Sequence, residues 1–288
     1  MTNSYPYKNW MSTTSSIDKL TLLELVWPGA HNSGVDYDFS YPIHVQPASH
    51  WFVCQDGPFI QQLNEGVRAL DLRFHSDEHW LGVKKLHTFH GFKLLRGRSL
   101  SELFKSLDFF LSENPDEFVV LDMRELKGLD EKSFDYTGFH EAIMSELGTR
   151  LIPRENRYLT LGALKKINPL QRIVVAADWH PDFNSPLYWP KIPVEWSGND
   201  FTSPEELRQY IERTLNNPPD ESALWSLSAT SYGELAGVKR ITRELNEWFA
   251  PDTGWTQKCS IISADFIGAT RLVSYCREIN LSRGQDKK

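Results

Sequence analysis

The chain has 288 residues, of which 40% are hydrophobic and 24% are charged, a composition typical of globular proteins with a sizeable core. Its formal net charge of -7 argues against a protein that binds by neutralising nucleic-acid phosphates, so nucleic acid is not an expected partner. Cys54, Cys259 and Cys276 are an odd number of widely spaced thiols, which fits neither a disulfide framework nor a paired-cysteine zinc site.

The amino-terminal segment, residues 1–19, is polar and lacks the apolar centre of an export signal. No apolar run of the sequence has the length that a transmembrane helix needs. We therefore expect a soluble monomer without a signal peptide or membrane span. Its location stays open between the cytoplasm and export by a non-standard route.

Short apolar runs alternate with amphipathic segments along the chain. The apolar runs predict β-strands at residues 22–30, 67–74, 118–123, 172–177, 223–229 and 260–266. Apolar residues at three- and four-residue spacing predict helices at residues 100–111, 136–147, 205–215 and 234–249. Ser99 or Ser101 can cap the first of these helices, and Ser203 followed by Pro204 starts the third.

This alternation favours an α/β fold, a single TIM-type (β/α) barrel that tolerates some distortion. No repeat or low-complexity linker marks a boundary, so residues 1–288 are expected to form one domain. In such barrels the chemistry gathers where strands end and loops begin. Polar residues at the carboxyl ends of the predicted strands are therefore the candidates for a functional site.

Five polar residues stand at or near such ends. His31 and Asp265 close the first and last predicted strands, Asp71 and Arg73 share one face of the second, and His90 precedes a glycine. Two histidines can move protons to and from the reacting oxygens, while a guanidinium stabilises the charge that develops on a phosphoryl group. This set suits cleavage of a phosphodiester by a neighbouring hydroxyl of the substrate, without a metal or another cofactor.

Several segments occur in a characteristic order over roughly the first half of the chain. They are residues 9–11 (NWM), 28–34 (PGAHNSG), 62–73 (QLNEGVRALDLR), 90–91 (HG) and 114–121 (NPDEFVVL). In this order the segments resemble the X domain of the phosphatidylinositol-specific phospholipase C superfamily, especially its bacterial-type, calcium-independent members. Five ordered motifs are much more specific than any one of them.

The resemblance implies a role for each of the five residues. His31 would be the general base, oriented by Asp265, and His90 would be the general acid, supported by Asp71. Arg73 would contact the phosphate. The substrate would be phosphatidylinositol or a related phospholipid head group, and the products would be a cyclic inositol phosphate and diacylglycerol.

Four further residues are expected to contact the substrate. Asn32 stands where bacterial-type relatives carry aspartate, and Arg124 lies near the place of an acidic calcium ligand in the calcium-dependent branch. With Arg73 at another ligand position of that branch, the resemblance argues against a metal site, although Asn32 alone matches a calcium ligand of that branch. Asp178 and Trp196 fall in stretches that line the head-group pocket of relatives, but they differ from the residues found there, so the head-group specificity stays open.

Two other classes of function remain as alternatives. One is a catalytically weak or inactive barrel that binds phospholipid head groups, and the other is a metal-dependent glycerophosphodiesterase. Aromatic residues in expected loops also leave open a peripheral contact with a membrane surface. The candidates for this contact are Trp51 with Phe52, and Tyr188 with Trp189.

Overall fold

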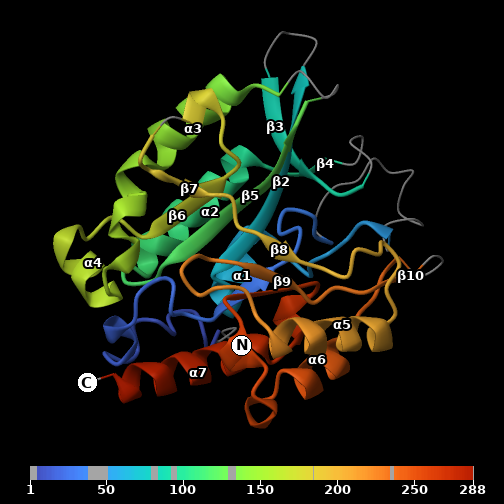
Figure 1. Cartoon of the computed structure of the whole chain (residues 1–288). Helices are drawn as coiled ribbons and strands as arrows, with labels where there is room; N and C mark the ends of the chain where they lie inside the picture. The colour runs from blue at the N-terminus through green and yellow to red at the C-terminus, as the bar shows by residue number, and fades with distance from the viewer. Residues whose placement is uncertain are drawn as a thin grey trace.

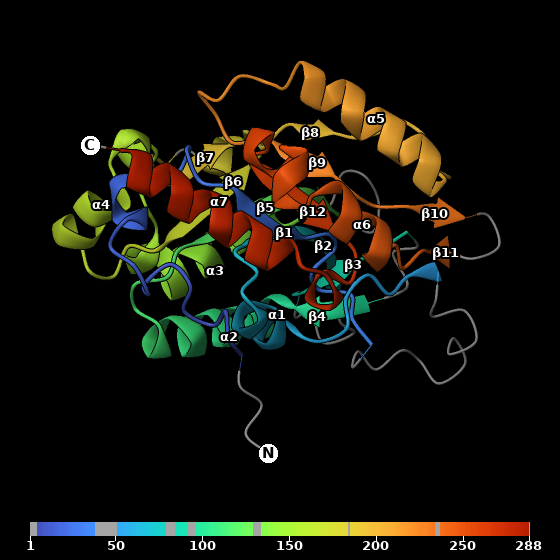
Figure 2. The same ribbon diagram turned by 90° about the horizontal axis from the view of Figure 1, so that it is seen from below.

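The computed structural model describes residues 5–37, 51–78, 84–91, 96–128, 134–183, 185–233 and 237–287. A curled sheet lies at the centre of the molecule, with helices around it (Figure 1). The view from below shows α5 on one side of this sheet, α1 and α2 on the opposite side, and α7 running across the view between them (Figure 2). No helix within the described part of the chain has the length and apolar character needed to cross a bilayer.

Eight strands form a parallel ladder in the order β7-β6-β5-β2-β1-β12-β9-β8. Their bounds are β1 (Trp27–Ala30), β2 (Ala69–Glu78), β5 (Val119–Lys127), β6 (Ile173–Ala177), β7 (Tyr188–Pro190), β8 (Val194–Glu195), β9 (Ser226–Ser228) and β12 (Ile261–Ala264). Among the described strands no pairing joins β7 to β8, so the curled sheet is open at this point. The predicted TIM-type barrel is confirmed, with this opening as its distortion.

The helices cover the outer surface of the curled sheet. Their bounds are α1 (Phe59–Glu65), α2 (Leu100–Glu113), α3 (Tyr136–Leu147), α4 (Leu161–Ile167), α5 (Pro204–Asn216), α6 (Thr242–Trp248) and α7 (Leu272–Asp286). Ser99 caps α2 and Ser203 caps α5, each through a capping box with the glutamate three residues later. Of the two predicted caps for α2, Ser99 is therefore the one used.

The fourth predicted helix begins later than expected. The sequence pattern suggested residues 234–249, of which 234–236 lie outside the described residues, whereas α6 spans Thr242–Trp248. Gly237 belongs to β11 (Gly237–Val238), which pairs antiparallel with β10 (Tyr232–Gly233), and its φ of 62° is incompatible with a right-handed helix. The apolar spacing that suggested the helix comes from Ile241, Leu245 and Phe249, which are all buried.

A second antiparallel feature extends the barrel beyond its parallel ladder. β3 (Lys84–Phe89) pairs with the last residues of β2, and β4 (Arg96–Ser99) pairs with β3. Neither strand was predicted. Because Glu78 pairs with Lys84 and Phe74 with Thr88, the segment after Phe89, which includes His90, returns toward the middle of β2, where Arg73 lies.

Alternation along the central strands decides which side chains enter the barrel. Leu70 and Leu72 belong to the core cluster that includes residues of the helices, whereas Ala69 belongs to a second cluster with Trp10 and Trp27. Asp71 and Arg73 have the same parity as Ala69, so they follow it on the inner face of the sheet, nearer its carboxyl edge.

The register also shifts where β2 meets β5. Leu72 pairs with Met123 and Arg73 pairs with Glu125, which leaves Arg124 as an extra residue on β5. Such a β-bulge redirects a side chain at the end of a strand. It occurs here at a residue that lines the cavity described below.

The amino-terminal end of the barrel is held by a buried ion pair. Arg68 donates to Glu117 from Nε at 2.9 Å and from Nη2 at 2.7 Å, and both side chains are fully buried. Glu117 also accepts from the backbone N–H groups of Met11 at 3.0 Å and Ser12 at 2.9 Å. One carboxylate therefore fixes the segment before the first strand to the barrel.

Candidate active site

His31 and Asp265 meet because their strands are neighbours in register. β1 and β12 are parallel, and Ala30 pairs with Ala264, so the next residue of each strand lies beside the other. His31 Nδ1 lies 2.7 Å from Asp265 Oδ1. Because a carboxylate only accepts, Nδ1 carries the proton and Nε2 keeps its lone pair. The arrangement presents a neutral imidazole that can take up a proton at Nε2.

Arg73 occupies the space in front of that lone pair. Its Nη2 lies 3.0 Å from His31 Nε2, and the same guanidinium donates to Asp71 from Nε at 3.2 Å and from Nη2 at 3.0 Å. Burial alone would raise the pKa of Asp71, but Arg73 and Arg124 hold it well below its usual range. Asp71 therefore stays ionised, and it fixes the guanidinium next to the imidazole.

His90 lies across from His31, with 6.0 Å between the two ring centroids. Its Nδ1 donates to the backbone carbonyl of Phe52 at 2.9 Å, and its Nε2 accepts from the Tyr232 hydroxyl at 3.0 Å. Burial lowers the pKa of His90 to about 4, and the positive charge of Arg73 acts in the same direction. The free protein therefore carries a neutral His90 at neutral pH.

The expected support of His90 by Asp71 is not what the described contacts show. Asp71 is engaged by Arg73, and its other close neighbours are Arg124 and His31, each 3.9 Å away. The physical reason is that the short Asp71 side chain shares the inner face of β2 with Arg73, which pairs with both of its oxygens. His90 is oriented from the opposite side, by Phe52 and Tyr232.

A cavity of about 740 Å³ is lined by His31, Asp71, Arg73 and His90, among other residues. Arg124 lines it too and donates to Asp122, which lies two residues before it on β5. Burial raises the pKa of Asp122 to about 6 even though Arg124 opposes this effect. The two guanidinium groups that line the cavity are thus each paired with an aspartate, Asp71 with a depressed pKa and Asp122 with an elevated pKa.

The other predicted substrate contacts lie in different settings. Asp178 and Trp196 line the open side of the cavity, where Trp196 is 48% exposed and Asp178 pairs with Lys191. Asn32 is only 2% exposed, and its Nδ2 lies 3.5 Å from His31 Nε2. Asn32 therefore contacts the imidazole, while Asp178 and Trp196 face the space that a substrate would fill.

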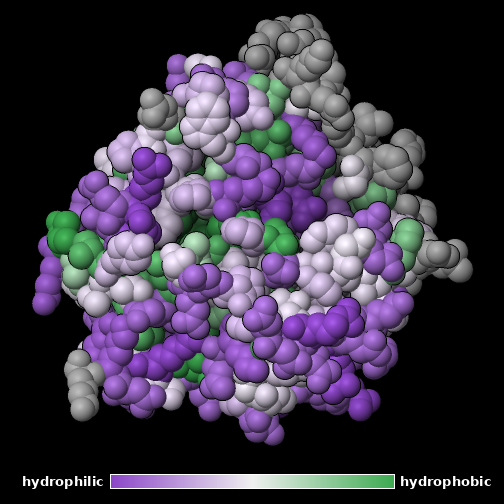
Figure 3. Space-filling model, in the orientation of Figure 1, coloured by the Kyte–Doolittle hydropathy of each residue, from purple (hydrophilic) through white to green (hydrophobic). Residues whose placement is uncertain are grey.

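Exposed aromatic residues border the cavity on the same side. Trp179, Trp196 and Phe201 line it and are 80%, 48% and 46% exposed. Apolar residues also gather near the centre of the face in Figure 3, with hydrophilic residues around them. The aromatic pair Tyr188 and Trp189, expected in a lipid-contacting loop, is instead buried in β7, so that prediction was wrong.

Sequence reasoning missed three residues that shape the site. Gln55 donates from Nε2 to the carbonyls of His31 at 2.7 Å and Ala264 at 3.0 Å, and so ties the two strand ends together. Tyr232 and Cys54 contact His90. Gln55 and Cys54 precede α1 in a loop and Tyr232 lies in a two-residue strand, so no periodic pattern marks them.

The geometry defines an α/β barrel of the TIM class with a His–Asp pair and an arginine at its carboxyl edge. Its fold is that of bacterial phosphatidylinositol-specific phospholipase C. The enzyme from Listeria monocytogenes has a TM-score of 0.68 at 17% identity and covers 95% of this chain and 98% of its own. A histidine-to-tyrosine mutant of the Staphylococcus aureus enzyme has a TM-score of 0.69 at 17% identity and covers 95% and 96%.

The sequence comparisons agree with this fold. No protein-family model matches the chain. Mouse PI-PLC X domain-containing protein 2 is 24% identical over 94% of this chain and 87% of its own length. The 1-phosphatidylinositol phosphodiesterase of Staphylococcus aureus strain Newman is 27% identical over 43% of this chain and 36% of its own.

The resemblance to the X-domain superfamily of phosphatidylinositol-specific phospholipase C is therefore confirmed. The broader sequence match is to the mouse protein and the narrower one is to the bacterial enzyme. The sequence comparison thus supports the superfamily without singling out its bacterial branch.

Proposed function

We propose that the protein cleaves the phosphodiester of phosphatidylinositol, or of a related phospholipid, by attack of a head-group hydroxyl on phosphorus. The observation that carries this proposal is the contact of His31 with both Asp265 and Arg73 at one end of the cavity. A general base, the group that orients it and a cation for the phosphate are thereby assembled within hydrogen-bonding distance.

The first step forms the cyclic product. His31 Nε2 takes the proton of the attacking hydroxyl, and the Asp265 carboxylate stabilises the imidazolium that forms through the proton on Nδ1. Arg73 turns its N–H donors from His31 Nε2 to the phosphoryl oxygens, where negative charge develops. The new P–O bond closes the cyclic phosphodiester on the head group.

The leaving group needs a proton as its bond to phosphorus breaks. In this proposal His90, across the cavity from His31, supplies it to the oxygen of diacylglycerol. Because His90 is neutral in the free protein, it must first be protonated. The anionic phosphodiester favours that protonation, since a nearby negative charge stabilises an imidazolium.

The proposed reaction uses no metal. Arg73 and Arg124 supply positive charge beside the place of the phosphate, and each is paired with an aspartate, Asp71 and Asp122. A metal-dependent glycerophosphodiesterase would need those carboxylates free as ligands, so the pairing favours the metal-free reaction. The exposed aromatic rim of Trp179, Trp196 and Phe201 would rest on a membrane surface while the head group enters.

A barrel that binds phospholipid head groups without turnover is the second candidate. Two observations on His90 favour it: its depressed pKa leaves the imidazole neutral, and its Nε2 accepts a hydrogen bond from Tyr232. The two candidates share the cavity and differ in whether product forms.

Phosphorus NMR of the protein with phosphatidylinositol in detergent micelles, in the presence of EDTA, separates these candidates. We expect the signal of a cyclic inositol phosphate to appear. His31→Ala and His90→Ala should each abolish it, whereas His140→Ala should not, because His140 lies on α3 and contacts Tyr188. Retention of lipid without product would favour the binding barrel, and activity that EDTA removes would favour a metal-dependent enzyme.

A further inference from the structure

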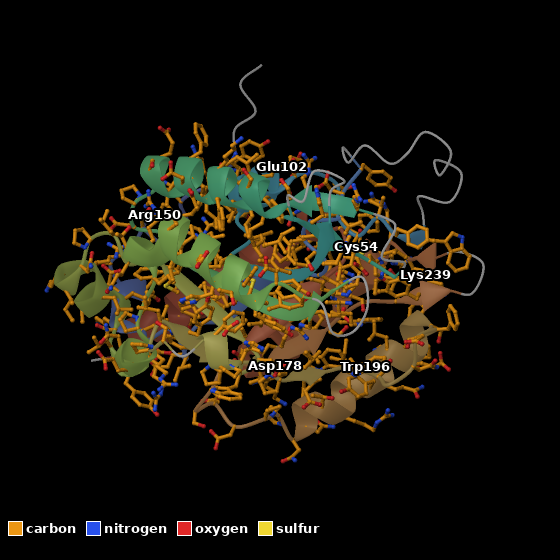
Figure 4. The ribbon with its side chains drawn as sticks, turned by 90° about the horizontal axis from the view of Figure 1, so that it is seen from above. Cys54, Glu102, Arg150, Asp178, Trp196 and Lys239 are labelled. Atoms are coloured by element: carbon orange, nitrogen blue, oxygen red, sulfur yellow. The ribbon has the colours of Figure 1, made fainter. Side chains whose placement is uncertain are left out.

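A sulfur atom lies beside the proposed catalytic base. One ligand atom each from His31, Cys54 and Asp265 lie within 4.8 Å of one another, and all three residues are buried. Cys54 is in the loop that precedes α1 and comes close to the pair from a different part of the chain than β1 or β12. Figure 4 shows it on the side of the molecule that carries β2 and β3, across from Asp178 and Trp196.

The second carboxylate oxygen of Asp265 takes no part in the contacts described above. Oδ1 accepts from His31, whereas Oδ2 is buried and has no hydrogen-bond partner among the described residues. The side chain is 3% exposed. A buried carboxylate oxygen without a donor is costly, and a cation would remove that cost.

The three donors form a set with a distinct preference. Imidazole nitrogen, thiolate sulfur and carboxylate oxygen are the ligand types of zinc sites, whereas calcium and magnesium take oxygen ligands. Tetrahedral coordination at about 2.0–2.3 Å puts ligand atoms roughly 3.5 Å apart. His31 Nδ1 and Asp265 Oδ1, at 2.7 Å, would have to separate, whereas ligand atoms that lie up to 4.8 Å apart would have to approach by about 1.3 Å. Three protein ligands leave a fourth position for water.

We propose that His31, Cys54 and Asp265 form a site for a zinc-like divalent cation, and that its occupation blocks the proposed catalytic base. The site would serve as an inhibitory metal site, distinct from any cation that assists the reaction. The binding part of this inference does not depend on catalysis, whereas the inhibitory part rests on the proposed function.

Protons and charges balance on binding. The Cys54 thiol loses its proton to solvent, which leaves a thiolate. The proton on His31 Nδ1 moves to Nε2, and Nδ1 gives its lone pair to the cation. A dication with one thiolate and one carboxylate is neutral, so binding turns a buried site with the single negative charge of Asp265 into one with zero net charge. His31 Nε2 then carries a proton and can no longer accept one from a substrate hydroxyl.

Two features of the site set the cost of binding. Burial raises the pKa of the Cys54 thiol well above its ordinary value, and the nearby Asp265 carboxylate acts in the same direction. Arg73 must also turn away from His31 Nε2, because two donors would otherwise face each other at 3.0 Å. The sulfur ligand itself favours thiophilic ions over calcium.

Cobalt(II) is a suitable probe because its absorption spectrum reports a thiolate ligand directly. Titration of the EDTA-treated protein with cobalt chloride should produce a thiolate-to-cobalt absorption that saturates at one equivalent and disappears when zinc is added. Cys259→Ser is the matched control, because Cys259 is also buried but lies beside Trp255 and the start of β12. This variant should retain the absorption and Cys54→Ser should lose it.

Zinc affinity and inhibition provide the second measurement. Competition with cobalt should show zinc binding weakened on the order of tenfold or more in Cys54→Ser, since loss of even an outer contact costs about 10–100-fold. Zinc should inhibit cleavage by the wild type and by Cys259→Ser, with each compared to its own rate in EDTA.

The absence of the thiolate absorption in the wild-type protein would overturn the site, and so would an unchanged absorption in Cys54→Ser. The wild-type spectrum decides the matter even where Cys54→Ser fails to fold. If cobalt binds through sulfur but no lipid is cleaved under any condition, the metal site stands and the proposed activity falls.

Discussion

The buried pair of Arg68 and Glu117 gives a prediction whose size can be worked out from the structure. Glu117→Gln keeps the shape of the side chain and removes its charge. Arg68 then remains fully buried, with hydrogen bonds to the carbonyls of Leu63, Val67 and Lys8 but without the carboxylate. The amide also presents donors where Glu117 accepted from Arg68 and from two backbone N–H groups.

The expected loss is set by the uncompensated charge. Burial lowers the pKa of Arg68, and Glu117 opposes this effect, so the carboxylate is what stabilises the buried cation. Removing one partner of a buried ion pair costs about 3–5 kcal/mol. With an unfolding entropy of about 2.1 cal/mol/K per residue, that loss corresponds to a fall in Tm of about 5–8 °C for a chain of this length.

Urea denaturation and thermal unfolding measure this loss. Asp116→Asn is the control, because Asp116 is 51% exposed and lies 3.9 Å from its partner Arg172. We expect a change within about 0.5 kcal/mol for this variant, as for other surface pairs. If Glu117→Gln lowered the free energy of unfolding by less than about 1 kcal/mol, the reasoning about the buried charge would be refuted.

Four further predictions concern the cavity. Asp265→Asn should lower kcat by about 10²–10⁴-fold, the usual worth of a positioned acid–base group, with little change in KM in a steady-state assay. Arg73→Asp should abolish cleavage in EDTA, and a cyclic product still visible by phosphorus NMR would contradict its contact with the phosphate. NMR titration should place the midpoint of His90 near pH 4, and a midpoint near its ordinary value of 6.5 would contradict the burial argument. Because the acid form is lost as the pH rises above that pKa, kcat/KM should fall from acidic toward alkaline pH.

The parts of the site that the sequence predicted are those that the barrel register dictates. His31 and Asp265 directly follow the adjacent strands β1 and β12, and Arg73 lies within the neighbouring strand β2, so the predicted strands alone bring the three residues together. The α2, α3 and α5 segments were predicted to within two residues because amphipathic spacing marks all three and capping serines mark α2 and α5.

The parts that were missed depend on contacts distant in sequence. His90 is oriented by a backbone carbonyl at Phe52 and a hydroxyl at Tyr232, and neither contact has a local sequence pattern. The opening between β7 and β8 was also beyond reach, because strands of three and two residues are too short to show periodicity.

The pairing of β3 with β2 has a consequence for how such a barrel can diversify. The proposed base His31, Asp265 and Arg73 lie on or directly after strands of the parallel ladder, whereas His90 follows a strand that pairs antiparallel at its margin. A change in the β2–β3 hairpin would therefore alter the proposed general acid, His90. The proposed base His31, Asp265 and Arg73 would stay in place. In barrels of this kind, the preference for the leaving group can thus change in evolution without a change in the residues that activate the attacking hydroxyl.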